Sequence, residues 1–189
     1  LLMQQSKLLR FAQKWNDSNE AACLIDLTTR EKLEFVKGDQ ISVNVEADAA
    51  SYHWLRSKPE KSVMLCHNHP GQSYYSMNDI RFFLIEESVG ALSIVTNQGK
   101  VWSISKTDKF ERDTAISGLA KFYVECGKDA DETIDKFLKS GYTYGKGGIE
   151  NMLDGKDPTP EEMSQWFDEV LGSKQNQINR SEEYTSELQ

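Results

Sequence analysis

The first hundred residues combine two hydrophobic periodicities. Leu8, Phe11, Ala12 and Trp15 recur at the spacing of one helix face, so residues 1–17 are predicted to be helical. Shorter apolar runs, bounded by polar residues, Gly and Pro, predict strands with two further helices among them. The predicted strands are residues 20–27, 33–37, 41–45, 62–66, 91–96 and 100–105, and the predicted helices are residues 48–56 and 77–86. This irregular order indicates an α+β (mixed α/β) fold with a mixed central sheet and flanking helices.

The pattern changes after Lys106, where only helical spacing remains. Two helices are predicted before a glycine-rich loop at residues 141–148, and a third follows at residues 159–172. The third begins with Thr159 as N-cap and Pro160 as the first helical residue. Its apolar stripe, which includes Trp166, needs cover, so the segment is expected to pack against the rest of the chain. The predicted organisation is a domain at residues 1–106, a helical C-terminal extension at 107–172 and a polar tail at 173–189.

Composition narrows the class of protein. The chain has 189 residues, 22 Lys plus Arg, 30 Asp plus Glu and a net charge of −8. This acidic balance disfavours nucleic-acid binding, which exploits a basic field. No apolar run is long enough to span a membrane, and no secretory signal is visible at the start. The three cysteines are far apart and form no CxxC pair, which is typical of core thiols in a reducing compartment and predicts a cytoplasmic location.

Two of the three histidines stand at His67 and His69, directly before Pro70 and Gly71. In an extended backbone, positions i and i+2 point to the same side, so both imidazoles can bind one metal ion. Asp79 follows in the first turn of the predicted helix and can complete a set of two His and one carboxylate. Such a set leaves zinc an open fourth position for water. The same Ser-x-x-Asp spacing also predicts a helix cap with no chemistry.

This combination resembles the JAMM (MPN-plus, or JAB) metallopeptidase family, most closely its bacterial and phage-associated branch. The resemblance covers roughly residues 1–106 and rests on His67-x-His69-Pro70, then Ser76-x-x-Asp79, with a glutamate upstream. Six residues separate His69 from Ser76, one fewer than in the usual family pattern. Glu20 fits the position of the family's glutamate, because it opens the first apolar segment after the N-terminal helix. Glu31, Glu34 and Glu46 are alternatives for that role.

The resemblance implies a role for each of these residues. His67, His69 and Asp79 would hold Zn²⁺, Glu20 would be the general base, and Ser76 would donate a hydrogen bond to the oxyanion. The family cleaves peptide or isopeptide bonds, so the expected function is a zinc-dependent hydrolase acting on a protein or peptide. The alternative is a catalytically silent binding or assembly module, as the family also contains. A role in phage particle maturation or bacterial DNA processing is a further alternative.

Overall fold

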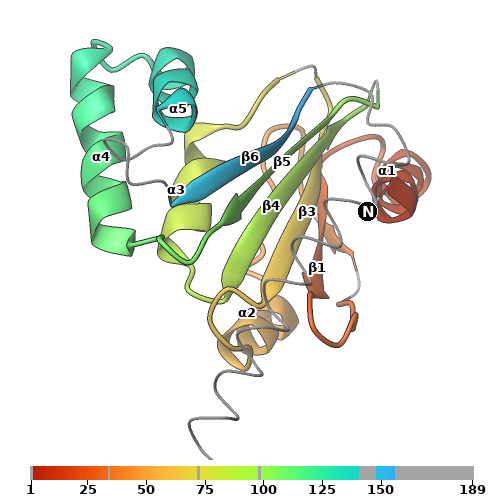
Figure 1. Cartoon of the computed structure of the whole chain (residues 1–189). Coiled ribbons are helices and arrows are strands. Elements are labelled where there is room, and N and C mark those ends of the chain that lie inside the picture. The colour runs from red at the N-terminus through yellow and green to blue at the C-terminus, as the bar shows by residue number, and fades with distance from the viewer. Residues whose placement is uncertain (1, 34, 72, 98, 141–147, 156–189) are drawn as a thin grey trace, which may run out of the picture.

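One mixed sheet of six strands organises the computed structural model, which describes residues 2–33, 35–71, 73–97, 99–140 and 148–155 (Figure 1). The strands lie in the order β2-β1-β3-β4-β5-β6. The pair β3 and β4 is parallel, and every other neighbouring pair is antiparallel. The strands are β1 (Ala21–Asp26), β2 (Val36–Lys37), β3 (Val63–His69), β4 (Val89–Thr96), β5 (Val101–Lys106) and β6 (Ile149–Asp154). The helices are α1 (Leu2–Trp15), α2 (Ala49–Arg56), α3 (Met77–Ile85), α4 (Arg112–Glu125) and α5 (Ala130–Lys139). The α+β class predicted from the sequence is confirmed.

The two faces of the sheet bury two separate apolar clusters. Along β1, Ala22 and Leu24 point to the face covered by α3, α4 and α5, whereas Cys23 and Ile25 point to the face covered by α1 (Figure 1). This alternation follows from the two-residue period of a strand. Phe83 of α3 is fully buried in the first cluster, a burial that contributes about 1.5–3 kcal/mol for a side chain of this kind. The sheet is therefore covered by helices on both sides.

The connection from β3 to β4 passes through α3, because parallel neighbours need a crossover. It runs from the carboxyl end of β3 at His69 to the start of α3 at Met77. The face of β3 that carries Val63 and Leu65 is the face that α3 covers. Residues at the end of β3 on this face are therefore brought against the first turn of α3.

The strand predicted at residues 41–45 is wrong. The Asp39 carboxylate accepts hydrogen bonds from the backbone N–H groups of Ile41 and Ser42 at 2.9 and 2.8 Å. In the same way, the side-chain oxygen of Asn44 accepts hydrogen bonds from the backbone N–H groups of Glu46 and Ala47. Donors engaged in such local turns are not available to a strand ladder, so this segment forms a loop.

The helical extension predicted at residues 107–172 also contains a strand that was not predicted from the sequence, because β6 pairs with β5. The helices α4 and α5 match the prediction for residues 107–139. The strand was missed because Ile149, Met152 and Leu153 do not alternate in sequence. The register shifts between Ser103 and Ile104 on the partner strand, and such an irregularity breaks the period of two. The helix predicted at 159–172 and the polar tail at 173–189 lie outside the described residues.

Candidate metal centre

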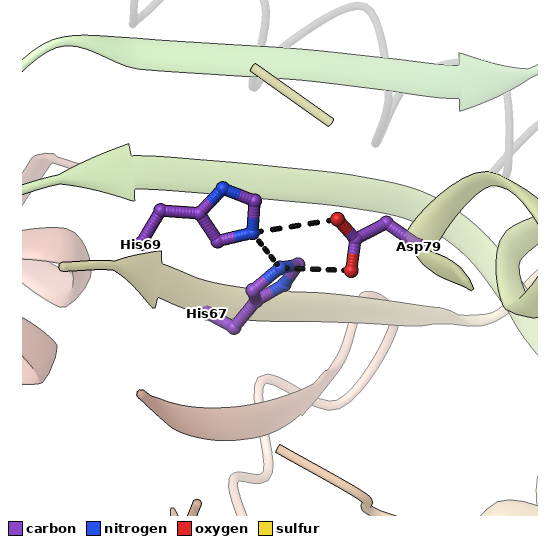
Figure 2. Close-up of side chains that lie close together, drawn as sticks. All are labelled: His67, His69 and Asp79. Atoms are coloured by element: carbon purple, nitrogen blue, oxygen red, sulfur yellow. Dashed lines mark hydrogen bonds and ion pairs between the residues drawn. The ribbon is translucent and has the colours of Figure 1, made fainter. Parts of the chain in front are cut away.

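His67 and His69 occupy the carboxyl end of β3, and their side chains point to the face of the sheet that α3 covers. Both are nearly fully buried, with 2% and 4% of their surface exposed. Their Nε2 atoms lie 3.0 Å apart (Figure 2). The Nδ1 atom of His69 is 3.1 Å from the carbonyl oxygen of Ser73, whereas the Nδ1 atom of His67 is buried with no hydrogen-bond partner among the described residues. The two imidazoles therefore face each other through their Nε2 atoms, which are the nitrogens available to a shared metal ion.

Asp79 comes to this point from the first turn of α3. Its Oδ1 lies 3.1 Å from Nε2 of His67, and its Oδ2 lies 3.3 Å from Nε2 of His69 (Figure 2). Ser76 is the N-cap, and the two residues form a capping box. The backbone N–H of Ser76 donates to the Asp79 carboxylate at 2.6 Å, and the Ser76 hydroxyl accepts from the backbone N–H of Asp79 at 3.2 Å. The helix cap predicted from the sequence is present, and it fixes the orientation of the carboxylate.

The donor set fits a divalent metal ion. One ligand atom from each of His67, His69 and Asp79 can be chosen so that all three lie within 4.8 Å of one another. In tetrahedral zinc sites, metal–ligand distances of about 2.0–2.2 Å place neighbouring ligand atoms roughly 3.3–3.6 Å apart. The two Nε2 atoms lie 3.0 Å apart, and each lies close to a different Asp79 oxygen, at 3.1 Å for Oδ1 and 3.3 Å for Oδ2, which is near that spacing. The three residues can therefore form one face of a coordination shell with little rearrangement.

In the triad, the negative charge of Asp79 and the positive charge of protonated histidine stabilise each other, and this changes the pKa of both kinds of side chain. Burial alone would raise the pKa of the Asp79 carboxyl, but the nearby His67 and hydrogen bonds from both histidines and Ser76 lower it well below its usual range. Burial would lower the pKa of His69, but the hydrogen bond and charge of Asp79, together with Glu20, raise it. The Asp79 carboxylate is thus anionic at neutral pH, as a metal ligand must be.

Glu20 lies on the same side of the sheet as the triad. Ala22 pairs with His67 across β1 and β3, and Glu20 stands two residues earlier on the same face. The backbone of Glu20 is held by bonds of 2.8 Å to Asp39 and Gly38. Its side chain is buried, with 7% of the residue exposed. Burial raises the pKa of the Glu20 carboxyl, an effect that the nearby imidazoles of His67 and His69 oppose.

A cavity of about 390 Å³ joins Glu20 to the triad. Its walls include Glu20, His67, Ser76 and Asp79, so the five site residues predicted from the sequence are brought together, with His69 in contact with two of them. The loop of residues 41–46 forms another wall, and sequence reasoning missed this because it assigned residues 41–45 to a strand. Ile41 has 84% of its surface exposed at this wall.

Of the two alternative glutamates that the structure describes, Glu46 lines this cavity and Glu31 does not, and the Glu46 carboxylate is 3.7 Å from Arg56. Glu31 is exposed and pairs with Lys58 at 2.8 Å. Glu34 lies outside the described residues. Glu20 is therefore the buried glutamate of the described part of the chain that faces the triad.

Sequence reasoning also missed Asn68, which lies between the two histidines and points to the opposite side of β3. Its Oδ1 accepts a hydrogen bond from the backbone N–H of Ala21 at 2.8 Å, and its Nδ2 donates to the carbonyl oxygen of Asn19 at 3.2 Å. These bonds fix the backbone on both sides of Glu20. The available signal in the sequence was an amide between two histidines at the end of an apolar run, and in the structure this amide is fully buried.

Comparison of the chain with known protein families, curated proteins and solved structures gave no match. In the described part of the chain, no helix has the length and apolar character needed to cross a bilayer. The functional assignment therefore depends on the geometry of this site and on the motif that it contains.

Proposed function

We propose that this chain is a zinc-dependent hydrolase that cleaves a peptide or isopeptide bond, with the site organisation of a JAMM-type metallopeptidase. The observation that carries the proposal is the convergence of His67, His69 and Asp79 beside a cavity that His67 and Asp79 share with the buried Glu20. A metal site alone would need only the first three residues. A buried glutamate beside a site of two His and one carboxylate supplies the proton-transfer group that hydrolysis requires.

Each residue has a distinct task in this proposal. His67, His69 and Asp79 hold the zinc ion, which when bound supplies a Lewis acid that polarises a carbonyl group and lowers the pKa of water. Glu20 accepts a proton from the attacking water and delivers it to the leaving amine. Its raised pKa suits this exchange, because a general base works best with a pKa near the operating pH.

Ser76 is the proposed hydrogen-bond donor to the oxyanion. Its hydroxyl oxygen already accepts from the backbone N–H of Asp79, and the hydroxyl proton remains available for a second partner. The residue lines the same cavity as Glu20. A donor fixed by a helix cap is preorganised, which is what stabilisation of an oxyanion requires.

The proposed substrate is a protein or peptide, and the motif resemblance supports this class. The proposed location is the cytoplasm. The support for it is that Cys23, Cys66 and Cys126 are buried and form no disulfide, although Cys23 and Cys66 lie opposite each other in neighbouring strands.

The second candidate is a catalytically silent binding or assembly module. One observation favours it: the capping box of Ser76 and Asp79 gives both residues a purely structural role at the start of α3. In this case the triad would stabilise the junction of β3 and α3, and Glu20 would have no proton to transfer.

Hydrolysis assays on metal-free and zinc-loaded protein separate the two candidates. The substrates are a set of internally quenched linear peptides and peptides joined through a lysine side chain. The hydrolase proposal predicts cleavage that disappears with a chelator and returns with an equimolar amount of zinc, but not with magnesium. Zinc-loaded protein that cleaves neither kind of bond would favour the binding module.

A further inference from the structure

A second cavity of about 430 Å³ lies where β5 passes into α4, lined by a different set of residues from the metal centre. Lys106, the last residue of β5, lines this cavity together with Phe110 and the first residues of α4. Leu84 and Glu87 form the wall contributed by the end of α3 and the segment after it. None of these residues lines the cavity of the metal centre, so Lys106 has no role in the function proposed above.

The amine of Lys106 has little electrostatic compensation. Its Nζ donates one hydrogen bond, to the backbone carbonyl of Glu86 at 2.8 Å, and lies 4.7 and 5.2 Å from the ring centres of Phe110 and Phe83. No carboxylate of the described residues lies within 4.0 Å of it. The Glu86 carboxylate instead pairs with Arg56 at 3.1 Å. A charged amine in such a half-buried place is costly unless it is paired.

A second lysine provides an internal comparison. The Nζ of Lys61 lies 5.9 Å from the ring centre of Phe110, but it also pairs with the Glu60 carboxylate at 3.3 Å. Burial and the like charge of Lys61 lower the pKa of Lys106 to about 7, against the opposing effect of Glu86, Glu60 and Glu87. At neutral pH a large fraction of Lys106 is therefore a neutral amine, the form that acts as a nucleophile.

We propose that Lys106 is a carbonyl-binding residue, which condenses with small neutral aldehydes or ketones that enter this cavity. The nitrogen lone pair adds to the carbonyl carbon, and the oxygen takes up a proton to give a carbinolamine. Loss of the hydroxyl group and of the proton remaining on nitrogen, together as water, forms the imine, which then binds a proton. The reaction consumes no oxidant or reductant.

The charges around the cavity favour a neutral partner. Glu60, Glu87, Glu111 and Asp113 line it, whereas Arg112 is its only cation besides Lys106 within the described residues, and Arg112 already pairs with Glu87 at 2.8 Å. An anionic carbonyl compound would be repelled. The protonated imine keeps a single positive charge on a nitrogen that the rings of Phe83 and Phe110 already face, so condensation adds no further charge to the cavity.

Reductive trapping on the full-length protein tests this inference. The protein is incubated at pH 7 with propanal and sodium cyanoborohydride, and the alkylated lysines are quantified by peptide mass spectrometry. Alkylation of Lys106 is expected to be at least about a hundredfold faster than that of Lys61, because about half of an amine with a pKa of about 7 is neutral at this pH, against roughly one in 2,500 for the lysine side chain of a model peptide. The rate at Lys106 should level off above a midpoint near pH 7. Replacing propanal by glyoxylate, which is anionic, should reduce the ratio of Lys106 to Lys61.

The unmodified chain supplies both arms of this comparison, so no variant needs to fold. The Lys106→Arg variant checks the assignment of the modified peptide. Equal rates at Lys106 and Lys61, or a Lys106 rate that still rises steeply at pH 9, would overturn the inference.

Discussion

Ala22 lies directly opposite His67 in the antiparallel pairing of β1 and β3, and both residues point to the face of the sheet that α3 covers. Because side chains alternate along a strand, this register also directs Glu20 and His69 to that face. A shift of one residue would send Glu20 to the face covered by α1. The pairing of two strands thus decides whether the cavity contains the carboxyl group of Glu20.

Replacement of Glu20 by Gln is predicted to retain the metal and to lower turnover by about a hundredfold or more, the usual scale of general acid–base catalysis. The amide keeps the size of the side chain but cannot accept the proton. Glu46→Gln is the matched control, since Glu46 lines the same cavity but is exposed and pairs with Arg56. The measurement is kcat for a cleaved peptide together with zinc content. Equal losses in the two variants would contradict the role of Glu20.

The metal-free protein is predicted to lose stability as the pH rises above about 6.5, the unfolded pKa of histidine. The pKa of His69 is raised on folding, so its contribution is fully present below the unfolded value of about 6.5 and is lost as the pH rises through the folded value. The pKa of Asp79 is lowered on folding, so its contribution is present above about 3.9 and is lost as the pH falls toward the folded value.

Denaturant unfolding in the presence of a chelator measures this dependence. Asp79→Asn should flatten the decline above about pH 6.5, because the amide oxygen can still accept the hydrogen bond from Ser76 but carries no charge to stabilise protonated His69. A decline of the same size in the variant would assign the pH dependence to other groups.

Gly90→Ala is predicted to destabilise the fold by about 1–3 kcal/mol, the usual cost of overpacking. A Cβ atom at Gly90 would lie 2.2 Å from the backbone carbonyl oxygen of Lys61. A backbone atom cannot move aside as the end of a flexible side chain can. At Gly71 the nearest atom would be 3.9 Å away, so Gly71→Ala is the control. Thermal or denaturant unfolding compares the two, and equal stabilities would show that the close approach of the backbones can relax.

Most of the fold follows from patterns that are local in sequence. The helix at the N-terminus, the hairpin of β4 and β5 and the cap at Ser76 each come from short-range signals, and the structure has all three. The loop at residues 41–46 could not be predicted in this way, because its apolar residues alternate as in a strand. The side chain of Asp39 determines the outcome by engaging the backbone donors.

The candidate site was predictable to a different degree for each residue. The spacing of His67 and His69 shows from sequence alone that they share a face. The meeting of Asp79 with these histidines, and the position of Glu20, depend on the crossover from β3 to α3 and on the register of β1. The local sequence pattern does not encode such long-range pairing, so only the motif resemblance could indicate that Asp79 and Glu20 lie near the histidines.

The metal content of the purified protein is the most direct test of the central claim that His67, His69 and Asp79 form a zinc site. The wild-type protein and the control variant His53→Ala, which changes an exposed histidine on α2, are predicted to bind an equimolar amount of zinc. The variant His67→Ala is predicted to bind none at the same free zinc concentration. Elemental analysis after dialysis in a zinc buffer measures all three, and a His67→Ala protein that still carried stoichiometric zinc would contradict the account.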